Sequence, residues 1–395
     1  MDTRLLHHYN IELDFMREMG NEFAHHFPKV AGRLGMEGLE CADPYVERML
    51  EGFAFLTARV QLKIEEEYPR FCQHLLEIVY PDYLAPLPSM TVVQLQPDCS
   101  DTDLAAGFRI ERGTVLQSGL GANMQTPCEY RTSHDLDLYP LSVVEADYLS
   151  TRAALANLGI KPDRQVSAGI RIGIEVAKGI DLSELTMSEL PLFLGGSGTV
   201  PMALYENILS GVCGLSVLTG GKKDRQVFAL GKENVRAHGF DNNQAMLNYQ
   251  SKSFEGYRLL REYFAFPERF RFINFSGFER VLPTASGQRF DLVIHLEDRN
   301  NDLENVIDKG NFLPFCTPAI NLFPKRADRI TLNEKDHEFH VLADRSRPLD
   351  YEVHQVLSVT GYGNQANIRQ QFLPFYGLKD EHAPSEHSAF FTIQR

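Results

Sequence analysis

The chain has 395 residues, of which 43% are hydrophobic and 23% are charged, and its formal net charge at pH 7 is −14. It is long enough for two or three domains, each with a sizeable core. The acidic balance argues against sequence-independent binding of nucleic acid and against adsorption to anionic membranes, because both depend on an excess of Lys and Arg.

The N-terminal segment MDTRLLHHYNIELDF interrupts its apolar residues with polar ones, which is not the pattern of a signal peptide. No apolar run approaches the ~18 residues that would indicate a membrane span. The cysteines form no C-x-x-C pair, so we expect reduced, buried thiols and a cytoplasmic protein. They are Cys41, Cys72, Cys99, Cys128, Cys213 and Cys316.

Apolar positions in the first 85 residues recur with the period of an α-helix. One set recurs at every fourth residue until Pro28, and a second follows Asp43-Pro44, an N-cap with a proline at the first helical position. This spacing lays each set along one face of a helix. The two sets are Ile11, Phe15, Met19, Phe23 and Phe27, and Met49, Phe53, Leu56, Val60 and Ile64.

The second helix is expected to end just before Pro69, because the residue before a proline disfavours helical geometry. A third helix is then expected as far as Pro81. Pro81, Pro86 and Pro88 lie within eight residues and predict a stiff, extended connector. We therefore predict a helical region over residues 1–85 that ends at this connector.

Beyond the connector the apolar period falls from about four to two, which is typical of strands. Segments of this kind, such as TVVQLQ (91–96) and RIGIEVA (171–177), are separated by Gly, Pro and Asn turns. They predict a β-rich, sandwich-like domain over residues 86–190.

The remaining sequence predicts a mixed α/β domain over 191–310 and a β-rich domain over 311–395. In the mixed domain, SFEGYRLLREYFAF (253–266) has a helical pattern that ends at Pro267. The last residues of the chain still have a strand pattern, so we expect the final domain to be incomplete. The predicted fold class is α+β, with N-terminal helices followed by sandwich-like β domains.

An aromatic-rich stretch, LREYFAFPERFRFINFSGF, covers residues 260–278. Large aromatic rings are most often buried, although aromatic and Arg side chains together are also common at the centres of interfaces. We interpret the stretch as core that supports an interface and keep direct contact with a partner as the alternative. The residues in question are Tyr263, Phe264, Phe266, Phe270 and Phe272.

The histidines do not suggest a metal centre. The adjacent pairs at 7–8 and 25–26 lie on predicted helices, where neighbouring side chains point about 100° apart. His337 and His340 would face opposite sides of a strand, and no third ligand is spaced to complete a site. We therefore predict neither a metal site nor a cofactor.

Local signatures of catalysis are also missing from the sequence. The glycine segments LGGSGTVP (194–201) and VTGYGNQ (359–365) lack the Lys-Ser/Thr ending of a phosphate-binding loop, and there is no G-x-S-x-G elbow. Glycine turns explain these segments. We predict that the protein is not an enzyme.

Several long segments resemble the TssF family of type VI secretion components, also called ImpG or VasA. They occur in the family's order, at residues 9–60, 75–94, 259–272, 317–330 and 344–359. The first begins YNIELDFMREMGNEFAHHF, and the last reads DRSRPLDYEVHQVLSV. A weaker resemblance, to the β-domain of phage baseplate-J-like proteins, lies in the range 86–190.

The resemblance implies a structural role in a baseplate wedge similar to those of contractile phages. It implies a cytoplasmic wedge of two TssF copies with one TssG, joined by TssK and TssE. Six wedges would surround a VgrG spike hub below a contractile sheath, docked at the inner membrane through partners.

The helical stripes suggest where such partners bind, because narrow apolar stripes need a second copy or a partner helix to cover them. The residues that we expect at the interface are Phe15, Phe23, Phe53, Leu56 and Val60. Two alternatives stay open: a carbohydrate-binding or hydrolytic β-domain protein, and a scaffold unrelated to secretion. The hydrolytic reading requires a pocket with two carboxylates roughly 5–9.5 Å apart.

Overall fold

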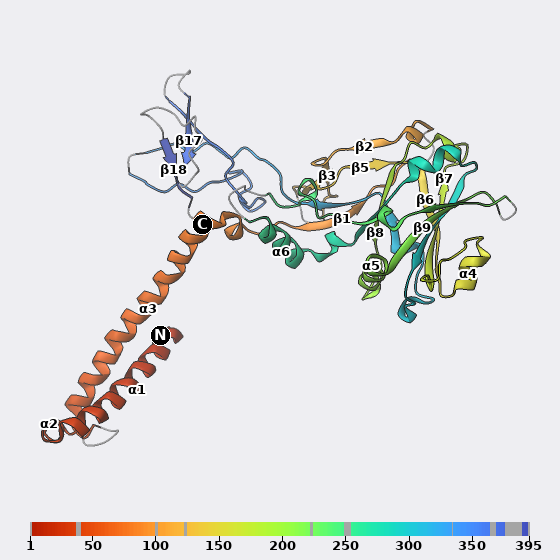
Figure 1. Cartoon of the computed structure of the whole chain (residues 1–395). Coiled ribbons are helices and arrows are strands. Elements are labelled where there is room, and N and C mark those ends of the chain that lie inside the picture. The colour runs from red at the N-terminus through yellow and green to blue at the C-terminus, as the bar shows by residue number, and fades with distance from the viewer. Residues whose placement is uncertain are drawn as a thin grey trace. The chain divides into compact units, whose positions relative to one another are not determined.

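The computed structural model describes residues 2–36, 41–98, 102–121, 125–221, 224–248, 254–333, 335–363, 369–375 and 389–393 (Figure 1). The chain forms two compact units. One consists of Met1–Ala85 with Pro374–Arg395, and the other of Pro86–Leu373. Each unit is described by itself.

The smaller unit is built on a helical hairpin of α1 (Thr3–His26) and α3 (Pro44–Val79), joined through the short α2 (Pro28–Arg33). Both long helices start at an aspartate. The Asp2 carboxylate accepts a hydrogen bond from the Arg4 amide at 3.0 Å, and the Asp43 carboxylate accepts one from the Tyr45 amide at 2.9 Å. These caps satisfy amides that a helix start leaves without partners.

The helix break predicted at Pro69 is wrong, because α3 continues through it as one helix of 36 residues. A proline inside a helix has no N–H to donate to the fourth preceding carbonyl, here that of Glu65, and this costs about 3 kcal/mol. Glu65 and Pro69 are both exposed, so water can hydrogen-bond the Glu65 carbonyl. The helical turns on both sides of Pro69 outweigh the local cost.

The larger unit contains two main antiparallel sheets. The first has the order β10-β9-β13-β7-β6 and the second the order β11-β12-β8-β14. The first is formed by β6 (Leu141–Leu149), β7 (Ala168–Val176), β9 (Val212–Thr219), β10 (Gln226–Leu230) and β13 (Arg289–Leu296). The second is formed by β8 (Glu189–Leu194), β11 (Val235–His238), β12 (Phe272–Ser276) and β14 (Phe312–Pro314).

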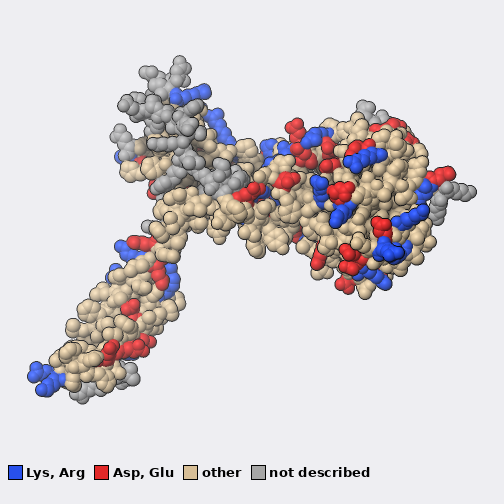
Figure 2. All heavy atoms as spheres, in the orientation of Figure 1, with Lys and Arg blue, Asp and Glu red and all other residues tan. Residues whose placement is uncertain are grey.

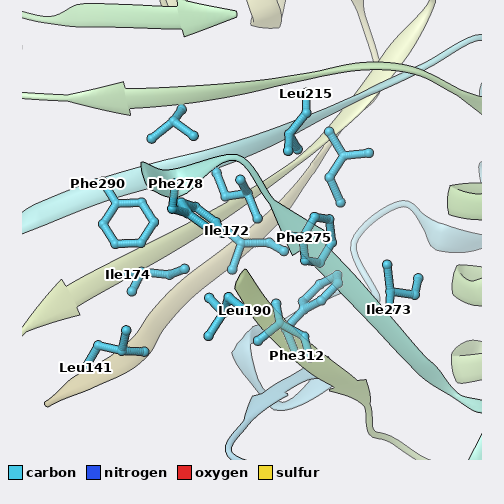
Figure 3. Packing of buried hydrophobic residues seen from close by; sticks show 14 of the residues in the cluster. Leu141, Ile172, Ile174, Leu190, Leu215, Ile273, Phe275, Phe278, Phe290 and Phe312 are labelled. Carbon is cyan, nitrogen blue, oxygen red and sulfur yellow. The ribbon is translucent and has the colours of Figure 1, made fainter. Parts of the chain in front are cut away.

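The core lies between these sheets (Figure 3). On β7, Ile172 and Ile174 alternate with outward-facing residues, and they pair in register with Leu292 and Phe290 of β13. They pack with buried side chains of the second sheet, such as Phe275. This is the sandwich-like arrangement that the period-two pattern predicts, and the predicted α+β class is confirmed.

The other elements border this core. The outer face of the first sheet is covered in part by α4, whose Leu155 is buried with Val293. A further sheet has the order β1-β15-β4-β3, β2 pairs with β5, and β16 pairs with β17. These strands are β1 (Met90–Gln94), β2 (Phe108–Ile110), β3 (Val115–Gln117), β4 (Glu129–Thr132), β5 (Leu136–Leu138), β15 (Cys316–Ile320), β16 (Val359–Tyr362) and β17 (Arg369–Pro374); β18 is Ala389–Phe391. The remaining helices are α4 (Arg152–Asn157), α5 (Val200–Gly211) and α6 (Glu255–Ala265).

The sheets combine strands from all three ranges predicted as separate β-rich or mixed domains. Strand β1, from the range 86–190, pairs with β15 from 311–395, and β13 from 191–310 pairs with β7 from 86–190. The boundaries predicted at 190 and 310 therefore do not separate sheets. Local periodicity identifies a strand but does not identify its partner.

Among the described residues, none of the helices has both the length and the apolar character that crossing a membrane requires.

The continuity of α3 makes Pro69→Ala a test of the fold. We expect the new amide at position 69 to donate to the Glu65 carbonyl, to exchange its hydrogen slowly and to stabilise the helix by about 1–3 kcal/mol. Hydrogen exchange and urea unfolding measure both effects. Gln61→Ala, at another exposed position of α3, is the control and should change stability by less than about 0.5 kcal/mol. A fast-exchanging amide at position 69 would contradict a continuous helix.

Candidate interaction surfaces

A row of large apolar side chains is exposed along α3. Its ten members lie between positions 45 and 78 with an average spacing of about 3.7 residues, close to one helical turn. They therefore stay on one face along the helix, which is roughly 54 Å long. Their exposed fractions lie between 47% and 84%. We call this row the α3 stripe; it consists of Tyr45, Met49, Phe53, Leu56, Val60, Ile64, Tyr68, Phe71, Leu75 and Ile78.

The α3 face that packs on α1 carries alanines and charged residues instead, with the half-buried Leu50 and Leu62 at its sides. Glu65 pairs with His8 of α1 at 2.9 Å, and Glu47 pairs with Arg17 of α1 at 3.8 Å. The fully buried Ala54 and Ala58 are each seven residues from one of these glutamates, so they share the same face. The hairpin therefore buries alanines and exposes aromatic and branched aliphatic residues.

The five residues expected at an interface are all exposed. Phe15 and Phe23 lie on α1, and Phe53, Leu56 and Val60 belong to the α3 stripe. Their contact with a partner stays a prediction. Sequence analysis missed the second half of the stripe because it ended the helix at Pro69, although the 4-3-4-3 spacing of apolar residues continues beyond it. The missed members are Tyr68, Phe71, Leu75 and Ile78, and at the start of the helix Tyr45 was also not singled out.

Helix α6 buries charged side chains and exposes apolar ones, the reverse of an ordinary surface helix. Its charged residues Arg258 and Glu262 are only 2% and 0% exposed, whereas Phe264 is 80% exposed. We call the exposed apolar side chains of this helix the α6 ridge. They are Phe254, at the N-cap, with Tyr257, Leu260, Tyr263 and Phe264.

Glu262 fixes the inward side of α6. Its Oε1 accepts hydrogen bonds from the amides of Met246 and Leu247, at 3.1 and 2.9 Å. The carboxylate also pairs with Arg269 and lies 3.5 Å from Arg258. A buried carboxylate needs such partners because transfer out of water is costly. Helix α6 is thereby held to the segment before it and to the turn after it.

The two arginines of this cluster are anchored further. Arg258 Nη2 donates to the Asn242 side chain at 3.0 Å. Arg269 donates to the Gly239 carbonyl, and its guanidinium stacks over Phe270 at 4.5 Å. Burial, with the positive charges of Arg258 and Arg112, lowers the pKa of Arg269 to about 9, which leaves it charged at neutral pH. We call Glu262, Arg258 and Arg269 the Glu262 cluster.

The aromatic stretch after residue 260, expected to be core, is divided by this arrangement. Phe270 and Phe272 are buried and Phe266 is half-buried, whereas Tyr263 and Phe264 are exposed. The exposure of these two corrects the expectation. Its physical reason is that Arg258 and Glu262 occupy the inward face of α6, which leaves the outer face to the rings. Whether the buried members support an interface stays a prediction.

A buried histidine, His134, and a half-buried one, His238, lie beside this cluster and were not singled out from the sequence. The rings of His134 and His238 meet edge to face, with centroids 4.9 Å apart, next to Phe272. Burial, and then the nearby charges of His238, Arg269 and Arg112, hold the pKa of His134 well below its usual value. Burial also lowers the pKa of His238, against the opposing charges of Glu189 and Asp241.

Other groups that resemble reactive sites are enclosed in the fold. Ser216 Oγ lies 3.1 Å from His295 Nε2, but Ser216 is only 1% exposed, so the pair joins β9 to β13 and offers no access to a substrate. Burial raises the pKa of the Cys316 thiol to about 12. The thiols of Cys41, Cys72, Cys128 and Cys213 are half-buried, not fully buried as expected, and Cys99 lies outside the described residues.

Comparison with known proteins gives consistent matches. Residues 1–395 match the sequence model of the family described as "Type VI secretion system, TssF". The type VI secretion system component TssF1 of Pseudomonas aeruginosa is 47% identical over 395 residues, which cover 100% of this chain and 63% of that protein. A chain of a TssK-TssF-TssG baseplate subcomplex solved by cryo-electron microscopy is similar with a TM-score of 0.65 and 27% identity, over 83% of this chain and 58% of that chain. This chain therefore spans less than two thirds of the length of either relative.

Glu262→Gln tests whether the charge inside α6 is required. We expect it to lower the free energy of unfolding by about 3–5 kcal/mol, because it leaves two buried arginines without their carboxylate. Glu255→Gln is the matched control. Glu255 pairs with the same Arg258 at 3.3 Å but is partly exposed, so its loss should cost less than about 1 kcal/mol. Equal effects in urea unfolding would contradict the assigned role of Glu262.

These two histidines predict a loss of stability in acid. An unfolded histidine takes up a proton near pH 6.5, whereas folded His134 does so only at lower pH. Their stabilising contribution is therefore complete above about pH 6.5 and is lost as the pH falls below it. We expect His134→Leu to show a smaller drop in unfolding free energy between pH 7.5 and pH 5.5 than the parent chain, measured by urea unfolding. An unchanged drop would contradict this assignment.

Proposed function

The chain belongs to the TssF family of type VI secretion systems, and from this premise we propose that it is a structural subunit of a type VI secretion baseplate. In this role it holds other subunits in a fixed geometry and does not make or break bonds. The exposed apolar surface of the helical hairpin is the observation that carries the proposal.

The hairpin needs a covering partner for a simple energetic reason. Burying apolar surface contributes about 25 cal/mol per Å², or roughly 1.5–3 kcal/mol for a large side chain that becomes fully covered. The ten residues of the α3 stripe leave most of this contribution unused in the isolated chain. Covering them with further helices would complete a helical bundle.

The members of the α3 stripe are all apolar, whereas other surfaces of the chain mix acidic and basic groups (Figure 2). Figure 2 shows acidic and basic side chains close together on the larger unit. One ion pair of this unit joins Arg171 to Glu145 at 2.8 Å. Such mixed charge keeps the remaining surface soluble.

We assign the α3 stripe, with Phe15 and Phe23 of α1, to helices of a TssG-type chain and of a second copy of this protein. The support is membership of the TssF family and the similarity to a chain of a TssK-TssF-TssG baseplate subcomplex. We further propose that two copies of this protein bind one TssG-type chain, and that the assembly contacts TssK, TssE, the VgrG hub and the sheath. We also propose that partners hold this assembly at the cytoplasmic face of the inner membrane.

The double variant Phe53→Ser/Val60→Ser tests the proposal. Both residues are exposed, so the isolated chain should keep its circular dichroism spectrum, while its binding to the TssG-type chain of the same organism should weaken by about 2–4 kcal/mol. Titration calorimetry measures the affinity, and light scattering measures the mass of the complex.

Arg59→Ser is the control for this experiment. Arg59 is exposed on α3 but lies to the side of the stripe, so the variant should bind like the parent chain. Binding of the double variant within twofold of the parent would remove the hairpin from the interface. A parent chain that binds no TssG-type partner would remove the proposed function.

A further inference from the structure

Helix α3 is supported by α1 over only part of its length. The N-terminal turns of α1 lie beside the middle of α3: His8 pairs with Glu65 at 2.9 Å, and Arg4 lies 3.6 Å from Glu66. Beyond these pairs α3 continues over residues 67–79, roughly 20 Å of further helix. The hairpin of two helices thus becomes a single helix in this region.

The burial of the side chains shows the same limit. Toward α1, the buried or half-buried positions of α3 recur every four residues at Leu50, Ala54, Ala58 and Leu62. The series then stops, because every residue from 63 to 69 is exposed. About two turns of the helix therefore lack a packed face.

Beyond Pro69 the half-buried positions lie on another face. They include Cys72, Leu76 and Tyr80, again four residues apart. This series is displaced by about 80° around the helix from the one that faces α1. The end of α3 packs on the turn that follows it, where the rings of Tyr80 and Tyr83 are 6.0 Å apart. The two ends of the helix are therefore held by different neighbours.

Pro69 lies in the stretch between these two supports. It has no N–H to donate to the Glu65 carbonyl, and its ring crowds that carbonyl, so the helix is weakest between these two residues. Sharp bends in helices occur mostly at proline. Since no side chain of residues 63–69 is buried, no packing within this stretch resists a bend.

We propose that Pro69 is a hinge of α3. Residues 44–66 move with α1 as one rigid hairpin, and residues 70–79 form a helical arm that changes direction relative to it. Such hinges are short stretches whose backbone absorbs the motion of the larger bodies on both sides. The hinge divides the α3 stripe, so that Phe71 changes direction relative to Phe53. The inference concerns the chain itself and does not rest on the proposed function.

Pairs of spin labels measure the bend. One pair replaces Arg59 and His74, on the two sides of the hinge, and the control pair replaces Arg48 and Lys63, both on the hairpin side. All four positions are exposed, and the members of each pair are separated by roughly 22 Å along the helix. The labels are carried by an unnatural amino acid, because the chain has cysteines of its own. Double electron–electron resonance on the isolated full chain gives the distribution of distances for each pair.

We expect the distribution across Pro69 to be at least twice as wide as that of the control pair. Pro69→Ala restores the hydrogen bond to the Glu65 carbonyl, so it should narrow the distribution across the hinge to the control width and leave the control pair unchanged. Equal widths for the two pairs in the parent chain would overturn the hinge. A distribution that stays wide in Pro69→Ala would overturn it as well, because the motion would then come from fraying of the helix end and not from the proline.

Discussion

The structure depends on one constraint: helices α1, α3 and α6 place large apolar side chains where no described part of the chain covers them. The fully buried residues of α3 are Ala54 and Ala58, and the buried residues of α6 are Arg258 and Glu262. The hydrophobic effect favours the reverse in a self-contained protein, and exposed apolar surfaces of this kind are typical of interaction sites, so we interpret both as candidate interaction surfaces. The hairpin supplies a long stripe, which suits bundling with other helices, and α6 supplies a shorter, wider ridge.

The β-rich unit is the opposite case, since its two main sheets cover each other. Paired strands β7 and β13 place Ile172 and Phe290 in a core that also includes Phe275 of the second sheet. Such packing is rigid, because interiors of this density resist displacement. The Glu262 cluster and Phe270 attach α6 to this rigid body, so the unit works as a platform that holds the ridge in one orientation.

Sequence reasoning predicts the features that depend on local spacing. The helix start at Asp43, the stripe through Phe53 and Val60, and the change to strands after the prolines all follow from period and capping. It fails where distant groups compete. Pro69 stays inside α3 because the helix on both sides outweighs one lost hydrogen bond. Tyr263 is exposed because the neighbouring Glu262 faces inward and accepts hydrogen bonds from the amides of Met246 and Leu247. No local sequence pattern identifies these two amides as its partners.

The placement of Glu262 shows how a sequence can keep an interface open. Replacing a buried ion pair by apolar residues is often neutral or stabilising, so an apolar inward face on α6 would serve the isolated chain at least as well. Such a face would, however, compete with the ridge for the same core, and the helix could then settle in either orientation. A carboxylate with two amide donors and two arginines has only one satisfied orientation. The charge therefore selects the orientation in which Phe264 faces outward, and the exposed ring is the consequence of that selection.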